Sequence, residues 1–549
     1  MSRNRILVAT FAATLTAFAA HGDSSRALPR RGGTDGPALF HVQDEKRSRP
    51  PAAGWQAVEG AIEEFDITVD PETVAADPEV VRIDLPSGLS LEAVRSSFTD
   101  YGPEWKSWTG TLRLAGATDQ GDGYAYLGYH GDRITGVLHF EGERYQITGG
   151  LDGPQRLVRQ SDELTGGANC GLHVRAGARA IPSKGDRPGR PASGDSPPTL
   201  GEKTLTRIDV MALYPRAYFV SPAAEIGLVD HVEDTIAQAN TIFVNSLVNA
   251  YYNLVHVGPI VDTQPSLQGP QGGLDLLNAQ TSEVNTLRDA YGADFVTMFV
   301  PFFWTGTTLS GPPCGVANMP VLNPSGIYDT TSGEVGLLGV NFGIRTYSAQ
   351  REGCGFGDFT LAHEMGHNWG MWHDTPYPSS IGTLMAAYAD AYYLSAVDKN
   401  TAMGCFNAGG AAGTAAVCKR IPYFSDDTAL YLGSYATGDT NHRNALMARS
   451  RLGSYPLFKS QQTISPPVAS FTRSCNSGTR TCSFNASGTT DNGTVTKYQW
   501  DFGDGTAIVT TTSPTINHTY GGSGTFYWVH LLATDNVNQR DLAADTATF

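Results

Sequence analysis

Three histidines and a glutamate lie close together in the stretch from Leu361 to Asp374. His363 and His367 are four residues apart, so on a helix they fall on one face, a single turn apart, and their imidazoles can share a metal ion. Glu364 would lie about 100° around the helix from His363, where its carboxylate can hold a water molecule without being a ligand. The spacing therefore predicts a metal site with its own general base.

His373 can join this site only if the helix ends before it. A continuing helix would carry His373 about 9 Å further along the axis and roughly 240° around from His367, so its side chain would point away from the metal. Gly370 can end the helix, because glycine adopts the left-handed conformation without a Cβ clash. Three neutral imidazoles would then leave the fourth tetrahedral position to water, which is the layout of a catalytic zinc site and not of a closed structural one.

The complete pattern H-E-x-x-H-x-x-G-x-x-H at residues 363–373 resembles the metzincin zinc metallopeptidases. Asp374, directly after the third histidine, resembles the reprolysin (adamalysin-like) branch. The alternative is a buried amphipathic helix with incidental histidines, which would need three His, one Glu and one Gly at fixed offsets. The resemblance implies an α/β catalytic domain with a mixed sheet against the zinc-site helix. It also implies hydrolysis of protein or peptide substrates through a zinc-bound water, with Glu364 as general base.

The family resemblance further implies a Met-turn, a tight turn whose methionine lies beneath the histidines. Two methionines downstream of His373 are candidates, Met403 and Met385. We favour Met403 because it leads into residues 418–425, which resemble bacterial reprolysin-like sequences. Neither methionine is followed two residues later by tyrosine, unlike the Met-turns of astacins and serralysins, so those two branches are disfavoured.

The overall composition is that of a multidomain exported protein. With 549 residues, the length alone suggests about three or four domains. The net charge of −16, from 54 acidic and 38 basic residues, argues against nucleic acid as a partner. Residues 1–20 carry Arg3 and Arg5 before an apolar run that ends in small residues, which is typical of a secretory signal peptide. The alternatives, a core helix or a membrane anchor, fit this run less well because it is short.

No later run of about 18 apolar residues follows, so we expect a secreted, extracellular bacterial protein with no membrane contact after signal cleavage. Residues 21–198 contain alternating stretches at 124–129, 134–140 and 145–147 that predict half-buried strands. We interpret this β-rich region as a propeptide, the alternative being a permanent accessory domain. From about residue 178 it becomes rich in Pro, Gly, Ser and Arg, which is typical of a cleavable linker.

The catalytic domain is predicted at residues 203–460. Strands are expected at 207–214 and 295–300, a long helix at about 223–252, a short helix at about 282–290, and the zinc helix at about 358–370. Strands that alternate with helices favour an α/β sheet.

Residues 467–549 read as short strands separated by turns, which predicts a small β-sandwich. The sequence W-D-F-G-D-G at 500–505 resembles a polycystic-kidney-disease (PKD) domain, an immunoglobulin-like module that would attach to protein or polysaccharide. Asp501 and Asp504 could form a calcium loop, although an Asp- and Gly-rich turn explains them equally well. A different class of function is a secreted binding protein with an inert metal domain, but binding alone needs no general base at Glu364.

Seven cysteines in an exported chain leave one unpaired. Grouping by domain predicts three disulfides: Cys314–Cys354, Cys405–Cys418 and Cys475–Cys482. The odd one, Cys170, is the only cysteine of the predicted propeptide and is a candidate fourth zinc ligand in a latent precursor. The alternative for Cys170 is a small buried hydrophobic residue.

Overall fold

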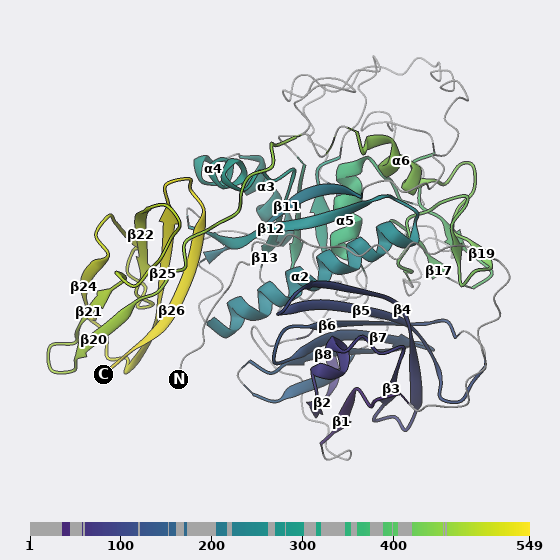
Figure 1. The fold of residues 1–549 in the computed structure, drawn as a ribbon, viewed down its shortest axis with the longest axis horizontal. Coiled ribbons are helices and arrows are strands. Elements are labelled where there is room, and N and C mark those ends of the chain that lie inside the picture. Colours follow the sequence, from purple (N-terminus) through teal and green to yellow (C-terminus); the bar gives the residue numbers. More distant parts are fainter. Residues whose placement is uncertain are drawn as a thin grey trace.

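The computed structural model describes residues 36–43, 58, 61–118, 121–151, 153–160, 170–172, 205–216, 222–261, 269–279, 281–300, 314–319, 346–352, 359–373, 388–397, 399–404, 420–453, 455 and 458–549, with backbone only at 170–172 and 222. The predicted signal peptide (1–20) and the linker from about 178 lie outside them. Figure 1 shows three parts: an N-terminal sheet, an α/β part that contains α5, and a C-terminal β-sandwich. Within the described residues, no helix combines the length and apolar character needed to cross a membrane.

The N-terminal domain is one antiparallel nine-stranded sheet in the order β1-β2-β9-β8-β7-β6-β5-β4-β3. Its elements are β1 Phe40–Val42, β2 Ala61–Val69, α1 Glu72–Ala75, β3 Val80–Asp84, β4 Ser90–Gly102, β5 Trp105–Leu114, β6 Gly123–Tyr129, β7 Ile134–Phe140, β8 Glu143–Gly149 and β9 Gln155–Gln160. The three predicted strands of this region are confirmed as β6, β7 and β8. One face of the sheet holds a core around Trp108, and the other packs against α2.

The α/β part is built on a six-stranded sheet in the order β10-β14-β15-β13-β11-β12, parallel except where β14 runs antiparallel to β15. The strands are β10 Cys170–Leu172, β11 Thr206–Pro215, β12 Ala250–Ile260, β13 Phe295–Val300, β14 Gly315–Ala317 and β15 Tyr347–Arg351. The helices are α2 Pro222–Asn245, α3 Gly269–Asn278, α4 Ser282–Tyr291, α5 Thr360–Trp369 and α6 Asn444–Arg451. Two small hairpins pair β16 Tyr393–Leu394 with β17 Lys399–Asn400, and β18 Leu430–Tyr431 with β19 Tyr435–Ala436. The predicted mixed sheet with helices is confirmed.

Side chains of β11 alternate between two apolar cores, as the period of a strand requires. Val210 and Ala212 belong to the core that contains α2 and α5. Met211 and Leu213 belong to the core that contains α3 and α4. The zinc-motif helix α5 is therefore fixed against one face of a sheet that is covered on both sides.

The predicted helix at 223–252 was wrong at its C-terminal end. Helix α2 ends at Asn245, and Leu247 adopts a positive φ of 57° that a helix cannot continue through. Residues 250–260 instead form β12, which pairs in parallel with β11 along its length. Long-range pairing of aromatic and β-branched residues decided the structure of this stretch.

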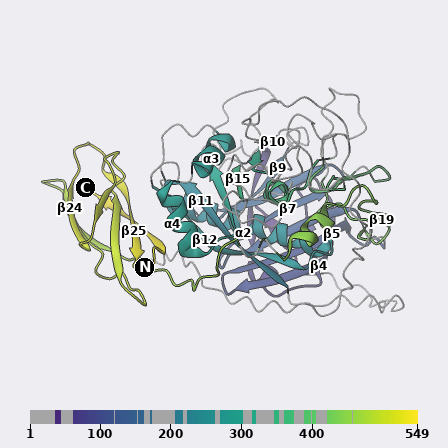
Figure 2. The same cartoon turned by 90° about the horizontal axis from the view of Figure 1, so that it is seen from above.

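The C-terminal part is the predicted β-sandwich. Three strands (β20 Thr472–Asn476, β21 Thr481–Asn485, β24 Thr515–Thr519) face four (β22 Val495–Asp501, β23 Val509–Thr511, β25 Phe526–Asp535, β26 Arg540–Thr548) around a core that includes Trp500. Cys475 and Cys482 form a disulfide between β20 and β21. Figures 1 and 2 show the sandwich at one side of the α/β part, next to α4.

Buried polar contacts join the sandwich to α4. Arg540 Nη1 lies 2.6 Å from Glu283 Oε1, and both side chains are only 6% exposed. The Arg540 N–H donates to the Tyr291 hydroxyl at 2.8 Å, and Gln539 Nε2 donates to the Ala290 carbonyl at 3.1 Å. The C-terminal sandwich is thus docked on the α/β part by specific contacts and not only by the connecting chain.

Candidate metal centre

Helix α5 carries the histidine motif and ends where glycine permits it. Gly370 adopts the left-handed conformation with φ 90° and ψ 18°. The Met371 N–H donates to the Gly366 carbonyl at 3.0 Å, which satisfies one of the last helical acceptors. The chain then pairs with residues 389–391, because the Trp372 N–H donates to the Ala389 carbonyl at 2.7 Å. This reversal brings His373 back toward the helix.

The three predicted histidines meet at one point. His363 Nε2 lies 3.1 Å from His373 Nε2, and the ring centroids of the three pairs are 4.7 to 5.0 Å apart. One ligand atom from each of His363, His367 and His373 lies within 4.8 Å of the others. All three are buried, with at most 4% exposure.

Backbone carbonyls orient two of these rings. The His363 Nδ1–H donates to the Ala402 carbonyl at 2.9 Å, and the His367 Nδ1–H donates to the Met371 carbonyl at 3.0 Å. Each Nε2 therefore carries the lone pair that a metal needs. Zinc–nitrogen bonds of about 2.0 to 2.1 Å in a tetrahedron place the nitrogens about 3.3 Å apart, close to the 3.1 Å between Nε2 of His363 and Nε2 of His373. The donor set and its spacing fit zinc.

The electrostatic environment keeps the imidazoles neutral. Burial, together with the charge of Arg420, lowers the pKa of His367 to about 4, against the hydrogen bond to the Met371 carbonyl, which acts in the opposite direction. Burial also holds the pKa values of His363 and His373 well below the ordinary value, with Arg420 and the neighbouring histidines acting in the same direction. All three side chains are therefore deprotonated at neutral pH and available as ligands.

Glu364 is 1% exposed and lies against strand β14 of the sheet. A Cβ added at Gly315, the first residue of β14, would lie 2.5 Å from Glu364 Cγ and 2.6 Å from its Oε1. The strand can approach this carboxylate only because residue 315 has no side chain. Neither Gly315 nor Arg420 was singled out from the sequence. A glycine inside a short strand is the one signal that could have pointed to Gly315.

Met403 lies beneath α5. It is fully buried in the turn 401–404, where the Gly404 N–H donates to the Thr401 carbonyl at 2.8 Å. A Cβ added at Gly366 would overlap the sulfur of Met403, so methionine and helix are in close contact. The carbonyl of the preceding residue, Ala402, accepts the hydrogen bond from His363. The other candidate, Met385, lies outside the described residues.

The structure places the remaining predicted residues only in part. The backbone of Cys170 begins β10 and pairs with Gly315, while its side chain lies outside the described part. Cys314 is disulfide-bonded, whereas Cys354, Cys405 and Cys418 lie outside the described residues.

The carboxylates of the candidate calcium loop have protein partners. Asp501 Oδ1 accepts from the Gly503 N–H at 3.0 Å. Asp504 accepts from Thr506 and lies 2.8 Å from His518 Nε2. These contacts agree with the turn interpretation of the two aspartates.

Residues 229–374, which include α5 and all three histidines, match the family model described as metallopeptidase family M12B, reprolysin-like. This part of the chain is reprolysin-like. Residues 464–549 match the model of the PKD domain. The reprolysin-like match supports a metalloprotease, and the family implies zinc. No curated protein matches the sequence.

Solved structures with similar parts include a chaperone–substrate complex, at 14% identity and a TM-score of 0.33, covering 47% of this chain and 36% of that one. Metalloproteinase-II from Bacteroides fragilis is 12% identical with a TM-score of 0.27, and the match covers 56% of this chain and 85% of that one. The PKD1 domain of Vibrio anguillarum Epp is 25% identical with a TM-score of 0.14, and the match covers 15% of this chain and 92% of that one. The chain thus spans about a third of the first of these structures.

Proposed function

We propose that the protein is a secreted zinc metalloendopeptidase that hydrolyses peptide bonds in protein or peptide substrates. The observation that carries this proposal is the convergence of three neutral, buried imidazoles at helix α5, which also carries Glu364, within a reprolysin-like sequence. His363, His367 and His373 would hold the zinc ion. When bound, zinc supplies a Lewis acid that polarises the scissile carbonyl and acidifies a water molecule.

The chain's own residues would do the rest of the chemistry. Glu364 would accept the proton of the attacking water and later deliver it to the leaving amine. The carbonyls of Ala402 and Met371 keep two histidines in the required tautomer. Met403, the proposed Met-turn residue, packs under helix α5 at Gly366 and would keep water from this face of the helix.

The N-terminal domain would be the propeptide, in residues 21–198, with the linker from about 178 joining it to a catalytic domain at 203–460. Strand β10 supports this role, because it pairs with β14 at the residue that lies against Glu364. Cys170 is the first residue of this strand, opposite Gly315 in the backbone register, and remains our candidate for the fourth zinc ligand in the latent precursor. The PKD domain, proposed at 467–549, would attach the enzyme to protein or polysaccharide.

Glu364→Gln tests the proposed base. The variant keeps all three ligands, so it should bind zinc as the parent does while peptidase activity falls by about 10² to 10⁴-fold. Activity is measured on an unfolded protein after linker cleavage, with and without a zinc chelator. Glu352→Gln is a matched control, because burial raises the pKa of that carboxyl to about 8 and the amide preserves its neutral form. Activity of Glu364→Gln within tenfold of the parent would exclude the proposed role.

The same measurement separates the alternative function. A secreted binding protein with an inert metal domain predicts no chelator-sensitive cleavage by the parent. Cleavage that the chelator abolishes would favour the enzyme.

A further inference from the structure

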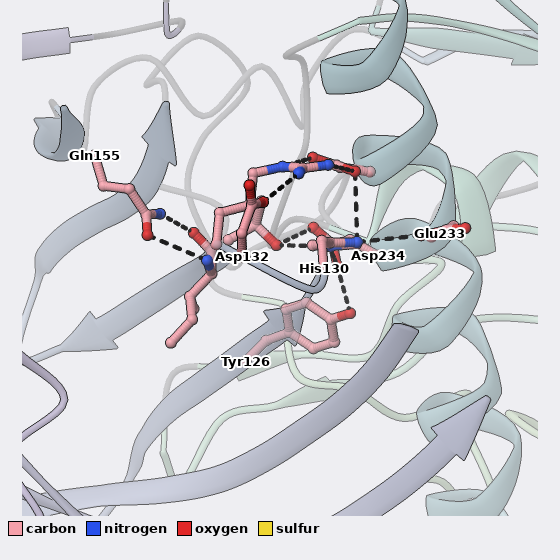
Figure 3. Close-up of polar contacts among 10 residues, drawn as sticks. Tyr126, His130, Asp132, Gln155, Glu233 and Asp234 are labelled. Carbon is pink, nitrogen blue, oxygen red and sulfur yellow. Dashed lines mark hydrogen bonds and ion pairs between the residues drawn. The ribbon is translucent and has the colours of Figure 1, made fainter. Parts of the chain in front are cut away.

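A buried polar cluster joins the N-terminal domain to helix α2 (Figure 3). We call it the α2 clamp; its members are His130 and Arg133 from the β6–β7 turn region, and Asp230, Glu233 and Asp234 from α2. The two His130 nitrogens lie 3.1 Å from Glu233 Oε2 and 3.0 Å from Asp234 Oδ1. Arg133 donates twice to Asp230, at 2.7 Å in each case.

The α2 clamp lies within the apolar contact between the two domains. His130 is 4% exposed and Asp234 is fully buried. One continuous hydrophobic cluster spans the same two domains and contains Tyr126 and Trp105 of the N-terminal sheet together with Val232 of α2. Ion pairs in such an environment are poorly screened and depend on each partner being present.

Gly128 of β6 permits the close approach. A Cβ at this position would overlap the Asp234 carboxylate and would come too close to Thr135 Oγ1 and His130 Nε2. Thr135 also donates to Asp234, as does the hydroxyl of Tyr126 at 2.8 Å. Asp234 is thus the centre of the contact, reached by three side chains of the N-terminal domain.

The charge balance of the clamp depends on His130. Three carboxylates of α2 face two cationic groups, and Arg133 stays protonated at any relevant pH. Burial alone would lower the pKa of His130. The carboxylates of Asp230 and Asp234, with hydrogen bonds to Asp234 and Glu233, outweigh burial and raise that pKa well above its ordinary value near 6.5.

His130 interacts with Thr135 of its own domain and with Asp230, Glu233 and Asp234 of α2. The groups that interact in turn with these carboxylates and with Arg133 come from both sides of the contact: Tyr124, Tyr126, Asp132 and Arg133 of the N-terminal domain, and His231 of α2. Burial raises the pKa of Glu233 too, with the bond to His130 opposing it. In the separated pieces a glutamate carboxyl ionises near pH 4.5. A loss of affinity that begins near pH 6.5 is therefore due to the deprotonation of His130.

The alternative interpretation of this cluster is a metal-binding site. Ligand atoms of His130, Asp230 and Glu233 lie within 4.8 Å of one another. However, both Asp230 oxygens already accept from Arg133, and both His130 nitrogens are hydrogen-bonded. The guanidinium and the imidazolium supply the positive charge that a metal would bring.

We propose that the α2 clamp is a proton-linked docking surface, which keeps the N-terminal domain bound to α2 after the linker is cut and loosens as the pH rises above about 6.5. His130 of the separated domain has lost its carboxylate partners, so docking takes up a proton. The affinity is therefore complete below the pKa of the free domain and is lost as the pH rises toward the higher pKa of the docked state, by at most about tenfold per pH unit. The proposal rests on the proposed function in one respect only, namely that the linker between the two domains is cleaved.

The test uses the full chain with Glu364→Gln, so that self-cleavage plays no part, and with a site-specific protease sequence inserted between residues 178 and 203. After the cut, the dissociation constant of the two pieces is measured from about pH 6.5 to about pH 8.5. We expect it to rise about tenfold per pH unit until the docked pKa is reached. His130→Gln should bind more weakly at pH 6.5 and show less than about a third of that slope. His41→Gln, a change at an exposed histidine of the same domain, should retain the parent slope.

Two further variants keep the proposal testable if His130→Gln does not fold. Asp234→Asn should reduce the slope from the α2 side. Gly128→Ala alters no charge, so it should raise the dissociation constant at every pH and leave the slope unchanged. A parent dissociation constant independent of pH, or parent-like binding by Gly128→Ala, would overturn the clamp. Loss of binding on adding a chelator would overturn it in favour of a metal bridge. None of these outcomes depends on peptidase activity, so failure here and failure of the proposed function are separate results.

Discussion

Gly315→Ala should disable the general base without touching a metal ligand. The glycine begins β14 and lies directly against Glu364, while His363, His367 and His373 are held from other sides by α5 and the following chain. Alanine is compatible with a strand, so the sheet pairing of β14 should persist. The three atoms nearest to the added methyl group all belong to the side chain of Glu364, so the overlap falls on this side chain first.

The size of the effect follows from the distances. The new Cβ would lie 2.5 Å from Cγ, 2.7 Å from Cδ and 2.6 Å from Oε1 of Glu364, whereas ordinary contacts begin at 3.4 Å. The carboxylate must therefore move by about 1 Å to relieve the overlap. A displacement of about 1 Å in a catalytic group costs on the order of 10²-fold in rate. We expect kcat to fall by about that factor while KM changes little, because the substrate-binding surface stays in place.

The assay is steady-state peptide hydrolysis after linker cleavage, together with the zinc content of each variant. Gly453→Ala is the matched control, since a Cβ there meets nothing within 4 Å. A Gly315→Ala enzyme with full zinc and kcat within about threefold of the parent would refute the reasoning, because it would mean that the position of Glu364 does not control the rate. Loss of zinc would also contradict it, since the three ligands should be undisturbed.

Three further predictions concern other parts of the chain. Arg540→Met should destabilise the docked PKD sandwich by about 3 to 5 kcal/mol, because it leaves Glu283 buried without its ion-pair partner; denaturant unfolding should show most of this recovered in Arg540→Met/Glu283→Gln. Burial lowers the pKa of His256 to about 3, so the unfolded chain binds a proton between about pH 6.5 and 3 that the folded chain does not, and stability should fall as pH falls through this window. His256→Phe should reduce the loss by up to about 1.4 kcal/mol per pH unit, and an unchanged pH dependence would contradict the assignment. Cys170→Ala should give a precursor that is active before linker cleavage, and a zinc shell of nitrogen and oxygen only, seen by X-ray absorption in the parent precursor, would exclude Cys170 as a ligand.

The sequence by itself determined those features that depend on near neighbours along the chain. The spacing of His363 and His367 requires a helix to bring them together, and Gly370 is needed to end it, since the next ligand would otherwise point away. Alternation predicted the strands of the N-terminal sheet, because side chains of a strand point to opposite faces whatever lies beyond them. Turn residues and short strands likewise predicted the C-terminal sandwich.

Only the tertiary structure decided which distant residues meet these elements. The carbonyl that orients His363 is 39 residues away at Ala402, and His130 contacts an aspartate 104 residues further along the chain. Neither contact has a local sequence signal, because its partners are brought together by the packing of α2 and α5 on the sheet. The end of α2 was decided in the same way. Pairing with β11 stabilises an extended chain at residues 250–260 more than local helix propensity stabilises a helix there. Spacing along the chain specified the chemistry of the metal centre, and long-range packing specified what surrounds it and what holds the domains to it.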